Sequence, residues 1–358
     1  MVLDERIPYA SSGETTAARE RLSGTGELSS KLFENVLIPT DLDPAAKPLV
    51  TLAADLAGRF HSQFVLVHVV PHEPTLARDP AVLRERRTEL EKLAAKLRDA
   101  GASYVQTILM EGNPAYHIEQ AARQHHVSVI LLSERSDASQ THAWFGTLTQ
   151  KLARRVDVPL MVVRPVGQHT LKPVLCVVDF TESSRKALKY AIALSRQTGT
   201  PLAVLHVVPE PLPSSMLEGP IWQGCGPADA GGKRSYAASQ NPDATTSTLI
   251  EDNRRTTLAR REVEDFLSRF DFSGVKHDVV VRSGSPVVEA LMVAKEHKSG
   301  VIAIGADHRS GFVHLMSQST AETLAETADI PVLIFRSAGE RPKVVGARSN
   351  PAVSLPIN

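Results

Sequence analysis

Asn35-Val-Leu-Ile-Pro-Thr-Asp41 is the stretch that decides the fold, because a close copy of it, Pro173-Val-Leu-Cys-Val-Val-Asp179, begins 138 positions later. The same spacing relates Leu66-Val-His-Val-Val-Pro71 to Val204-Leu-His-Val-Val-Pro209. Each stretch is a short apolar run, rich in β-branched residues, that ends in a turn residue, which is typical of a buried strand. Fixed spacing of this kind marks an internal repeat, so the chain is two copies of one domain in tandem.

Later in the chain the spacing grows to 172 positions. Gly112-Asn-Pro114 corresponds to Gly284-Ser-Pro286, and Asp157-Val-Pro-Leu-Met-Val-Val-Arg164 corresponds to Asp329-Ile-Pro-Val-Leu-Ile-Phe-Arg336. The second copy therefore holds about 34 extra residues between Pro209 and Gly284. The segment 210–248 is rich in Pro, Gly, Ser and Ala, which predicts a mobile loop that leads into a helix.

Both copies alternate short apolar runs with amphipathic segments, the pattern of right-handed βαβ units in a parallel sheet. We therefore expect an α/β fold with two Rossmann-like, open parallel five-stranded sheets flanked by helices, arranged as a pseudo-twofold tandem. We further expect the two sheets to be stacked. The expected strands are 35–41, 63–70, 103–110, 127–133 and 158–164 in the first copy, and 173–179, 201–208, 275–282, 300–305 and 331–336 in the second.

The repeat also predicts the division into domains. We expect a flexible N-terminal extension over 1–31, a first domain over 32–166, a second over 171–337 with its insertion at about 210–248, and a C-terminal tail over 338–358. Forty basic residues balance forty acidic ones, so neither a nucleic acid nor an anionic membrane is an expected partner. The two cysteines and the lack of an apolar secretory segment near the start favour a soluble protein of the reducing cytoplasm.

The segment after the first strand has helical periodicity in both copies. Its apolar stripe is Leu49, Leu52, Ala53, Leu56, Ala57 and Phe60 in the first copy, and Ala187, Tyr190, Ala191 and Leu194 in the second. Asp43 before Pro44, and Thr181 before Glu182, are the expected helix caps. Asp41 and Asp179 come two residues before these caps, at the carboxyl end of the first strand, where open parallel sheets bind their ligands.

Taken together, these strand ends, the Val-His-Val runs, the Gly-x-Pro turns and the closing Asp-x-Pro strands resemble universal stress protein domains. The resemblance covers about 32–166 and 171–337. In the nucleotide-binding members of that family, the loop after the fourth strand reads Gly-x2-Gly-x9-Gly-Ser/Thr. Its glycines permit positive φ, so that backbone N–H groups form a nest for phosphate at the start of a helix.

This chain keeps the spacing of the loop and replaces several of its glycines. The first copy has Ser133, Ser136, Gly146 and Thr147, and the second has Gly305, His308, Gln318 and Ser319. A side chain forced into the left-handed region costs roughly 1–2 kcal/mol, so two such changes would weaken phosphate binding by about 30- to 1,000-fold. The serine hydroxyls and a protonated His308 would offset this loss by donating hydrogen bonds to phosphate.

The resemblance implies one nucleotide site in each copy, with the aspartate and the second-strand valine holding the base and the loop surrounding the phosphates. The candidate residues are Pro39, Thr40, Asp41, Val69, Gly112, Ser133, Ser136, Gly146 and Thr147 in the first copy, and Asp179, Val207, Gly284, Gly305, His308, Gln318 and Ser319 in the second. The expected ligand is ATP or another adenine nucleotide, with Mg²⁺ accompanying it. Neither a catalytic residue nor a protein metal site is expected.

Simpler interpretations stand beside these. Asp41 and Asp179 are also typical turn formers, because Asp bonds its own backbone at such positions. His68 and His206 have valine neighbours, which favours strand histidines with satisfied hydrogen bonds over ligands. Cys176 lies in mid-strand and is expected to be inert. No Gly-x-Ser-x-Gly elbow supports a hydrolase.

Three functions remain open at this point, and the one ranked last is an ATP-consuming enzyme such as a weak ATPase or a phosphotransferase. The first is a tandem stress-response protein that binds an adenine nucleotide and signals its occupancy, with at most weak ATP hydrolysis. The family commonly pairs two domains through strand five, so Leu160–Val163 and Val332–Phe335 are expected to pair within the chain and to make it a built-in dimer. Whether two such chains form a homodimer is left open. The second is a nucleotide-independent module that binds an unknown protein partner.

Overall fold

The computed structural model describes residues 32–42, 47–70, 80–133, 147–153, 155–164, 170–209, 242–306 and 320–336. The expected N-terminal extension, the C-terminal tail and most of the insertion lie outside these residues, as do the candidate helix cap Asp43 and the loop residues Ser136, Gly146, His308, Gln318 and Ser319.

The first copy contains the strands and helices that the repeat predicts. They are β1 (Asn35–Pro39), α2 (Lys47–Phe60), β2 (Gln63–Val70), α3 (Pro80–Asp99), β3 (Val105–Glu111), α4 (Pro114–Gln124), β4 (Val129–Ser133), α5 (Thr147–Ala153) and β5 (Leu160–Val163). Each strand begins and ends within two residues of its expected bounds.

The second copy repeats this order. Its elements are β6 (Val174–Val177), α6 (Glu182–Thr198), β7 (Leu202–Val208), α8 (Pro242–Leu267), β8 (His277–Ser283), α9 (Pro286–Glu296), β9 (Val301–Gly305), α10 (Thr320–Thr327) and β10 (Val332–Phe335). Helix α8 takes in residues 242–248, which the composition had assigned to the inserted loop, because Pro242 supplies a favourable first turn.

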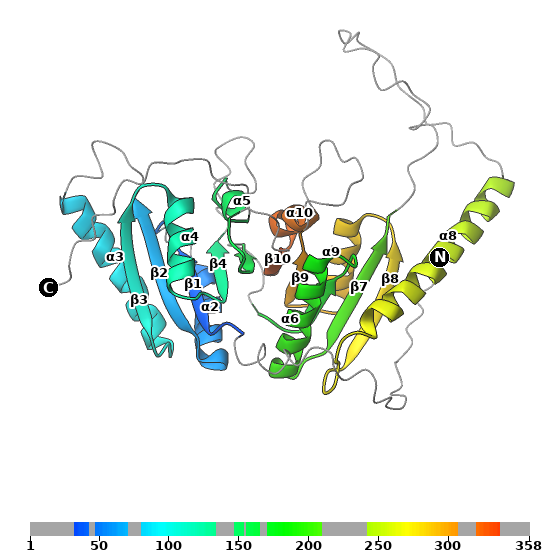
Figure 1. Ribbon diagram of the computed structural model, residues 1–358, viewed down its shortest axis with the longest axis horizontal. Helices are drawn as coiled ribbons and strands as arrows, with labels where there is room; N and C mark the ends of the chain where they lie inside the picture. Colours follow the sequence, from blue (N-terminus) through cyan, green and yellow to red (C-terminus); the bar gives the residue numbers. More distant parts are fainter. Residues whose placement is uncertain are drawn as a thin grey trace, which may run out of the picture.

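The two halves form one sheet. Its strand order is β3-β2-β1-β4-β5-β10-β9-β6-β7-β8, and Figure 1 shows the halves side by side with α5 and α10 near the middle. Within each half the strands are parallel, whereas β5 and β10 pair antiparallel, with Met161 opposite Leu333. The predicted pairing through strand five is confirmed. The expected α/β fold with five parallel strands in each half is also confirmed. The expected stacking of the two sheets is wrong, because β5 and β10 are apolar edge strands that cover each other and so join the halves edge to edge.

The apolar core is continuous across the two halves on one face of the sheet and divided on the other. Helices α2, α3, α6 and α8 contribute to a single cluster. Helices α4 and α5 pack over a second cluster, and α9 and α10 over a third. The predicted helical stripes of both copies are buried. Parallel strands joined by right-handed crossovers place the helices on these two faces.

An aromatic bridge joins the halves within the continuous cluster. The ring of Phe33, at φ 54° just before β1, lies 4.9 Å from the ring of Phe60 and 5.7 Å from that of Tyr190 in the second copy. Tyr190 in turn lies 5.1 Å from Phe335 of β10. The bridge is completely buried at Phe33, so separating the two halves would expose a large apolar surface.

A polar link crosses the same seam. The guanidinium of Arg164, after β5, donates to the carbonyl of Thr327 at the end of α10 over 3.2 Å and lies 3.3 Å from the carboxylate of Asp329. A cation at this position suits the negative end of the helix dipole.

Among the residues that the structure describes, no helix is both long and apolar enough to span a bilayer.

Candidate functional site

Within each half, the candidate residues gather at the carboxyl ends of the strands. The strands of one half are parallel and end at the same edge of that half, and the strand order reverses between β1 and β4 and again between β6 and β9. Such a reversal sends the following helices to opposite faces and leaves a place for a ligand between the two strand ends. Asp41 follows β1 and Ser133 ends β4, while Asp179 follows β6 and Gly305 ends β9.

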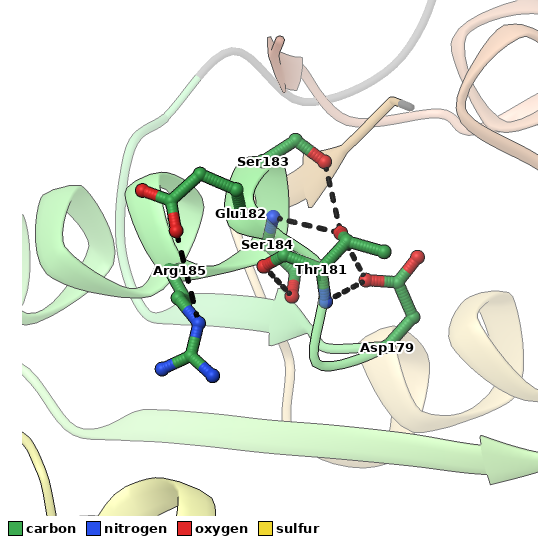
Figure 2. A network of polar contacts seen from close by, with 6 residues as sticks. All are labelled: Asp179, Thr181, Glu182, Ser183, Ser184 and Arg185. Carbon is green, nitrogen blue, oxygen red and sulfur yellow. Dashed lines mark hydrogen bonds and ion pairs between the residues drawn. The ribbon is translucent and has the colours of Figure 1, made fainter. Parts of the chain in front are cut away.

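Asp179 is held by a polar network at the start of α6, drawn in Figure 2. Its Oδ1 accepts hydrogen bonds from the backbone N–H of Thr181 (3.1 Å) and from the Thr181 hydroxyl (2.6 Å). Thr181 is the N-cap of α6, and its hydroxyl oxygen accepts from the backbone N–H of Ser184, which confirms the predicted cap. The simpler interpretation of Asp179 as a turn former is thus correct for Oδ1, whereas the second carboxylate oxygen points away from the network.

The turn after Asp41 has the same backbone shape. Leu42 has φ 65° and its counterpart Phe180 has φ 66°, so each copy turns through the left-handed region immediately after the aspartate. In the first copy the amide of Leu42 donates to the hydroxyl of Thr40 over 3.0 Å. Both aspartates are exposed to solvent at the edge of the sheet. Both domains therefore hold the residue after the aspartate in the same strained conformation.

The two strand histidines are satisfied, as expected. Nδ1 of His68 lies 2.8 Å from the carbonyl oxygen of Thr40, and Nδ1 of His206 lies 2.8 Å from that of Val178. The ring of His206 also stacks on Phe180, with centroids 4.5 Å apart. This stack was not foreseen, although an aromatic residue directly after Asp179 was visible in the sequence.

The universal stress protein family matches this chain twice, over residues 32–164 and 170–336. The chain belongs to the universal stress protein family. Universal stress protein YxiE of Bacillus subtilis is 24% identical over 163 residues, which cover 45% of this chain and 97% of that protein.

Two solved structures are similar in fold to most of this chain. One, a universal stress protein from Archaeoglobus fulgidus, is 17% identical with a TM-score of 0.55 and covers 84% of this chain and 96% of its own. The other, a putative universal stress protein from Pseudomonas aeruginosa, is 18% identical with a TM-score of 0.51 and covers 87% of this chain and 95% of its own. At these identities the likeness shows the fold alone.

The Gly-x-Pro turns of both universal stress protein domains share one backbone conformation. Gly112 has φ 130° and Gly284 has φ 144°, values that a residue with a Cβ rarely adopts. Each glycine donates its amide to the end of the neighbouring strand, to Val70 over 2.9 Å and to Val208 over 3.0 Å. The turn therefore lies next to β2 or β7 at the same edge as the aspartate.

Gly305 needs to be glycine for a reason other than the predicted one. Its φ lies outside the left-handed region, so it forms no nest by positive φ. Instead, a Cβ on Gly305 would lie 2.5 Å from the amide nitrogen of Ser184 and would also collide with the hydroxyl of Ser183. The start of α6 packs directly on the end of β9. The first domain has Ser133 at this position, where the sequence comparison had counted a lost glycine.

The helices after the two candidate loops begin where the sequence predicts. Helix α5 starts at Thr147, and α10 starts at Thr320, one residue after Ser319. The loops themselves, 134–146 and 307–319, lie outside the described residues, so the structure brings together only the strand-end members of each candidate set: Pro39, Thr40, Asp41, Val69, Gly112 and Ser133, and Asp179, Val207, Gly284 and Gly305.

Cys176 is fully buried in β6. Burial, together with the negative charge of Asp179, raises the pKa of its thiol far above the ordinary value, which disfavours the reactive thiolate. The described residues contain no group of three side chains suited to hold a metal ion.

Proposed function

We propose that this universal stress protein binds an adenine nucleotide at the carboxyl ends of the parallel strands of a domain and signals its occupancy, without substantial catalysis. The observation that carries the proposal is the equivalent placement of Asp41 and Asp179, each exposed and each beside the point where the strand order reverses. Open α/β sheets bind their ligands at such points.

The aspartates suit an adenine base. An ionised carboxylate only accepts hydrogen bonds, and the exocyclic amino group of adenine only donates them. Asp179 uses Oδ1 to accept from Thr181, which fixes the direction of the side chain, and Oδ2 points out of the network. The backbone of Val69 or Val207, on the adjacent strand, is the second contact that we propose for the base.

The phosphates would lie toward the ends of β4 and β9. We propose Ser133, Ser136, Gly146 and Thr147 as their partners in the first domain, and Gly305, His308, Gln318 and Ser319 in the second, with Mg²⁺ entering together with the nucleotide. Gly112 and Gly284 would line the side of the nucleotide opposite these residues.

Because this universal stress protein has a free, buried thiol at Cys176, we place it in the cytoplasm.

A nucleotide panel tests the proposal. Isothermal calorimetry and thermal denaturation with ATP, ADP, AMP and cyclic AMP should show saturable heat and a rise in melting temperature for at least one ligand. Mass spectrometry of the denatured protein should identify any nucleotide that copurifies. Absence of heat and of stabilisation at millimolar nucleotide would overturn the proposal.

Matched variants assign the site. Asp41→Asn and Asp179→Asn keep the shape of the side chain but place an amide next to the amino group of the base. The variant in the occupied domain should bind about tenfold or more weakly, since a hydrogen bond to a charged group is lost and an unpaired donor is left. A double variant that binds as tightly as the wild type would move the site elsewhere.

A nucleotide-independent interaction module remains the second candidate, and one observation favours it for the second domain. There Oδ1 of Asp179 and the hydroxyl of Thr181 find their partners within the protein, and the start of α6 packs directly against Gly305. The same panel separates the two functions, because a module of this kind would give neither heat nor stabilisation with any nucleotide.

A further inference from the structure

His68 and His206 occupy equivalent places in β2 and β7, and each reaches across to the first strand of its domain. Their Nδ1 atoms lie 2.8 Å from the carbonyl oxygens of Thr40 and Val178, the residues immediately before Asp41 and Asp179. A carbonyl oxygen only accepts, so Nδ1 carries the ring proton in both histidines. The two imidazoles thus bind the backbone at the point where each aspartate leaves the sheet.

The histidine hydrogen bond occupies a position where a regular parallel sheet would have a backbone hydrogen bond, here called a rung of the ladder. In the first domain the amide of Thr40 donates to the carbonyl of Val67 over 2.9 Å. A regular parallel ladder would continue with the amide of Val69 donating to the carbonyl of Thr40. The pairing stops at Pro39 opposite Val67, and within the described part of the chain no backbone hydrogen bond joins Val69 to Thr40.

The second domain shows the same interruption. The amide of Val178 donates to the carbonyl of Leu205 over 2.8 Å, and the pairing stops at Val177 opposite Leu205. Among the described residues, the rung that would follow, from the amide of Val207 to the carbonyl of Val178, is again missing, and His206 binds that carbonyl. The recurrence in two domains of different sequence indicates a requirement of the site rather than a local accident.

We propose that His68 and His206 are positioning residues that end the pairing of the first two strands one rung early. Each imidazole donates its Nδ1 proton to the carbonyl of Thr40 or Val178. The next backbone amide of the second strand, that of Val69 or Val207, is then directed at the ligand position beside the aspartate. An N–H donor next to a carboxylate acceptor matches the edge of adenine that carries a ring nitrogen and the amino group. The inference rests on the proposed nucleotide function and names what sets its selectivity for adenine.

Two pairs of substitutions test this role. His68→Leu with His206→Leu removes the donor, so the carbonyl is free to accept the backbone amide and the missing rung can form. His68→Asn with His206→Asn keeps an N–H donor close to the position of Nδ1. We expect the leucine variant to bind nucleotide about tenfold more weakly and the asparagine variant to remain within about threefold of the wild type. Circular dichroism confirms that both variants are folded.

Amide hydrogen exchange gives a readout that needs no nucleotide. In the ligand-free wild type the amides of Val69 and Val207 should exchange readily, and in the leucine variant they should become protected by the new rung. Unchanged exchange together with unchanged affinity in the leucine variant overturns the inference, as does equal weakening by leucine and asparagine. If the wild type binds no nucleotide, the proposed function fails, and the exchange of the two amides alone decides the role of the histidines.

Discussion

The two halves of the sheet have the same strands, the same turns after the aspartate and the same histidine bonds, yet different side chains stabilise the helices around each site. In the first half, Glu119 of α4 is nearly buried and pairs with Arg123 on its own helix and with Arg155, 2.7 Å away, just after α5. In the second half the corresponding residue of α9 is Leu291, which packs against the apolar cluster under α10. One backbone arrangement therefore tolerates an ionic link and an apolar contact at the same place.

A second difference lies at the end of the fourth strand of each half. Gly305 lets the start of α6 pack against β9, whereas the first half has a serine there. Substitutions that make one half resemble the other will show which of these differences matter for stability.

Phe33→Ala should have the largest effect, because Phe33 is fully buried and its ring contacts Phe60 and Tyr190. Loss of a buried phenylalanine ring costs about 3–5 kcal/mol. Urea denaturation should show this loss in the free energy of unfolding. Phe33→Leu is the matched control, since the equivalent residue of the second half is Leu171, and it should cost about 1–2 kcal/mol. Equal losses for the two variants would contradict a role of the aromatic contacts.

Gly305→Ala should be next, at about 1–3 kcal/mol, because the added methyl group meets the backbone of Ser184 and must displace the start of α6. Ser133→Ala in the first half introduces no larger side chain and serves as the control, with a change below about 1 kcal/mol. Thermal denaturation measures both. A Gly305→Ala protein as stable as the wild type would show that α6 relaxes freely.

Glu119→Gln should lower the free energy of unfolding by about 1–2 kcal/mol, because it removes a nearly buried carboxylate from two ion pairs. The loss stays this small because both arginine partners are more than a third exposed, so water screens the pairs. The loss should shrink in 1 M NaCl, because salt weakens the ion pairs of the wild type. Glu119→Leu introduces the residue found at Leu291 in the second half and tests whether an apolar contact restores the lost stability. A loss that is independent of salt would argue against the ionic link.

The smallest effects are expected at the ends of the two equivalent helices. Gly199 ends α6 at φ 65°, and its counterpart His61 follows α2 at φ 53°. A Cβ on Gly199 meets no atom within 4 Å, so Gly199→Ala should cost only the backbone strain, about 1 kcal/mol. His61→Gly should stabilise the first half by up to about 1 kcal/mol for the same reason. Calorimetry should show a lower melting temperature for Gly199→Ala and a higher one for His61→Gly.

Much of this fold follows from the sequence, because each strand of the repeat is predicted independently from two different stretches of sequence. The strands, the Thr181 cap, the Gly-x-Pro turns and the exposed aspartates are local features, and local propensity and turn chemistry predict them. The pairing of β5 with β10 was also foreseen, since two apolar edge strands have to be covered. The expectation of stacked sheets failed because covering both edges at once joins the sheets edge to edge.

Other features depend on contacts that no local pattern contains. Phe33 precedes the first strand, and its partner Tyr190 lies more than 150 positions away. The role of Gly305 arises from the close approach of α6, so counting glycines in the loop gave the wrong reason for it. The histidines were predicted to be satisfied, but that each replaces a rung of the ladder depends on which strand the ring faces.

The antiparallel seam between β5 and β10 lies within one polypeptide. Partners that associate through such a seam as separate chains come apart on dilution and carry identical sites, because one gene encodes both. Here the covalent connection keeps the halves together at any concentration and fixes them at a ratio of one to one. It also lets each half change its own residues independently, which is how a single molecule can carry an ionic link on one side and an apolar contact on the other.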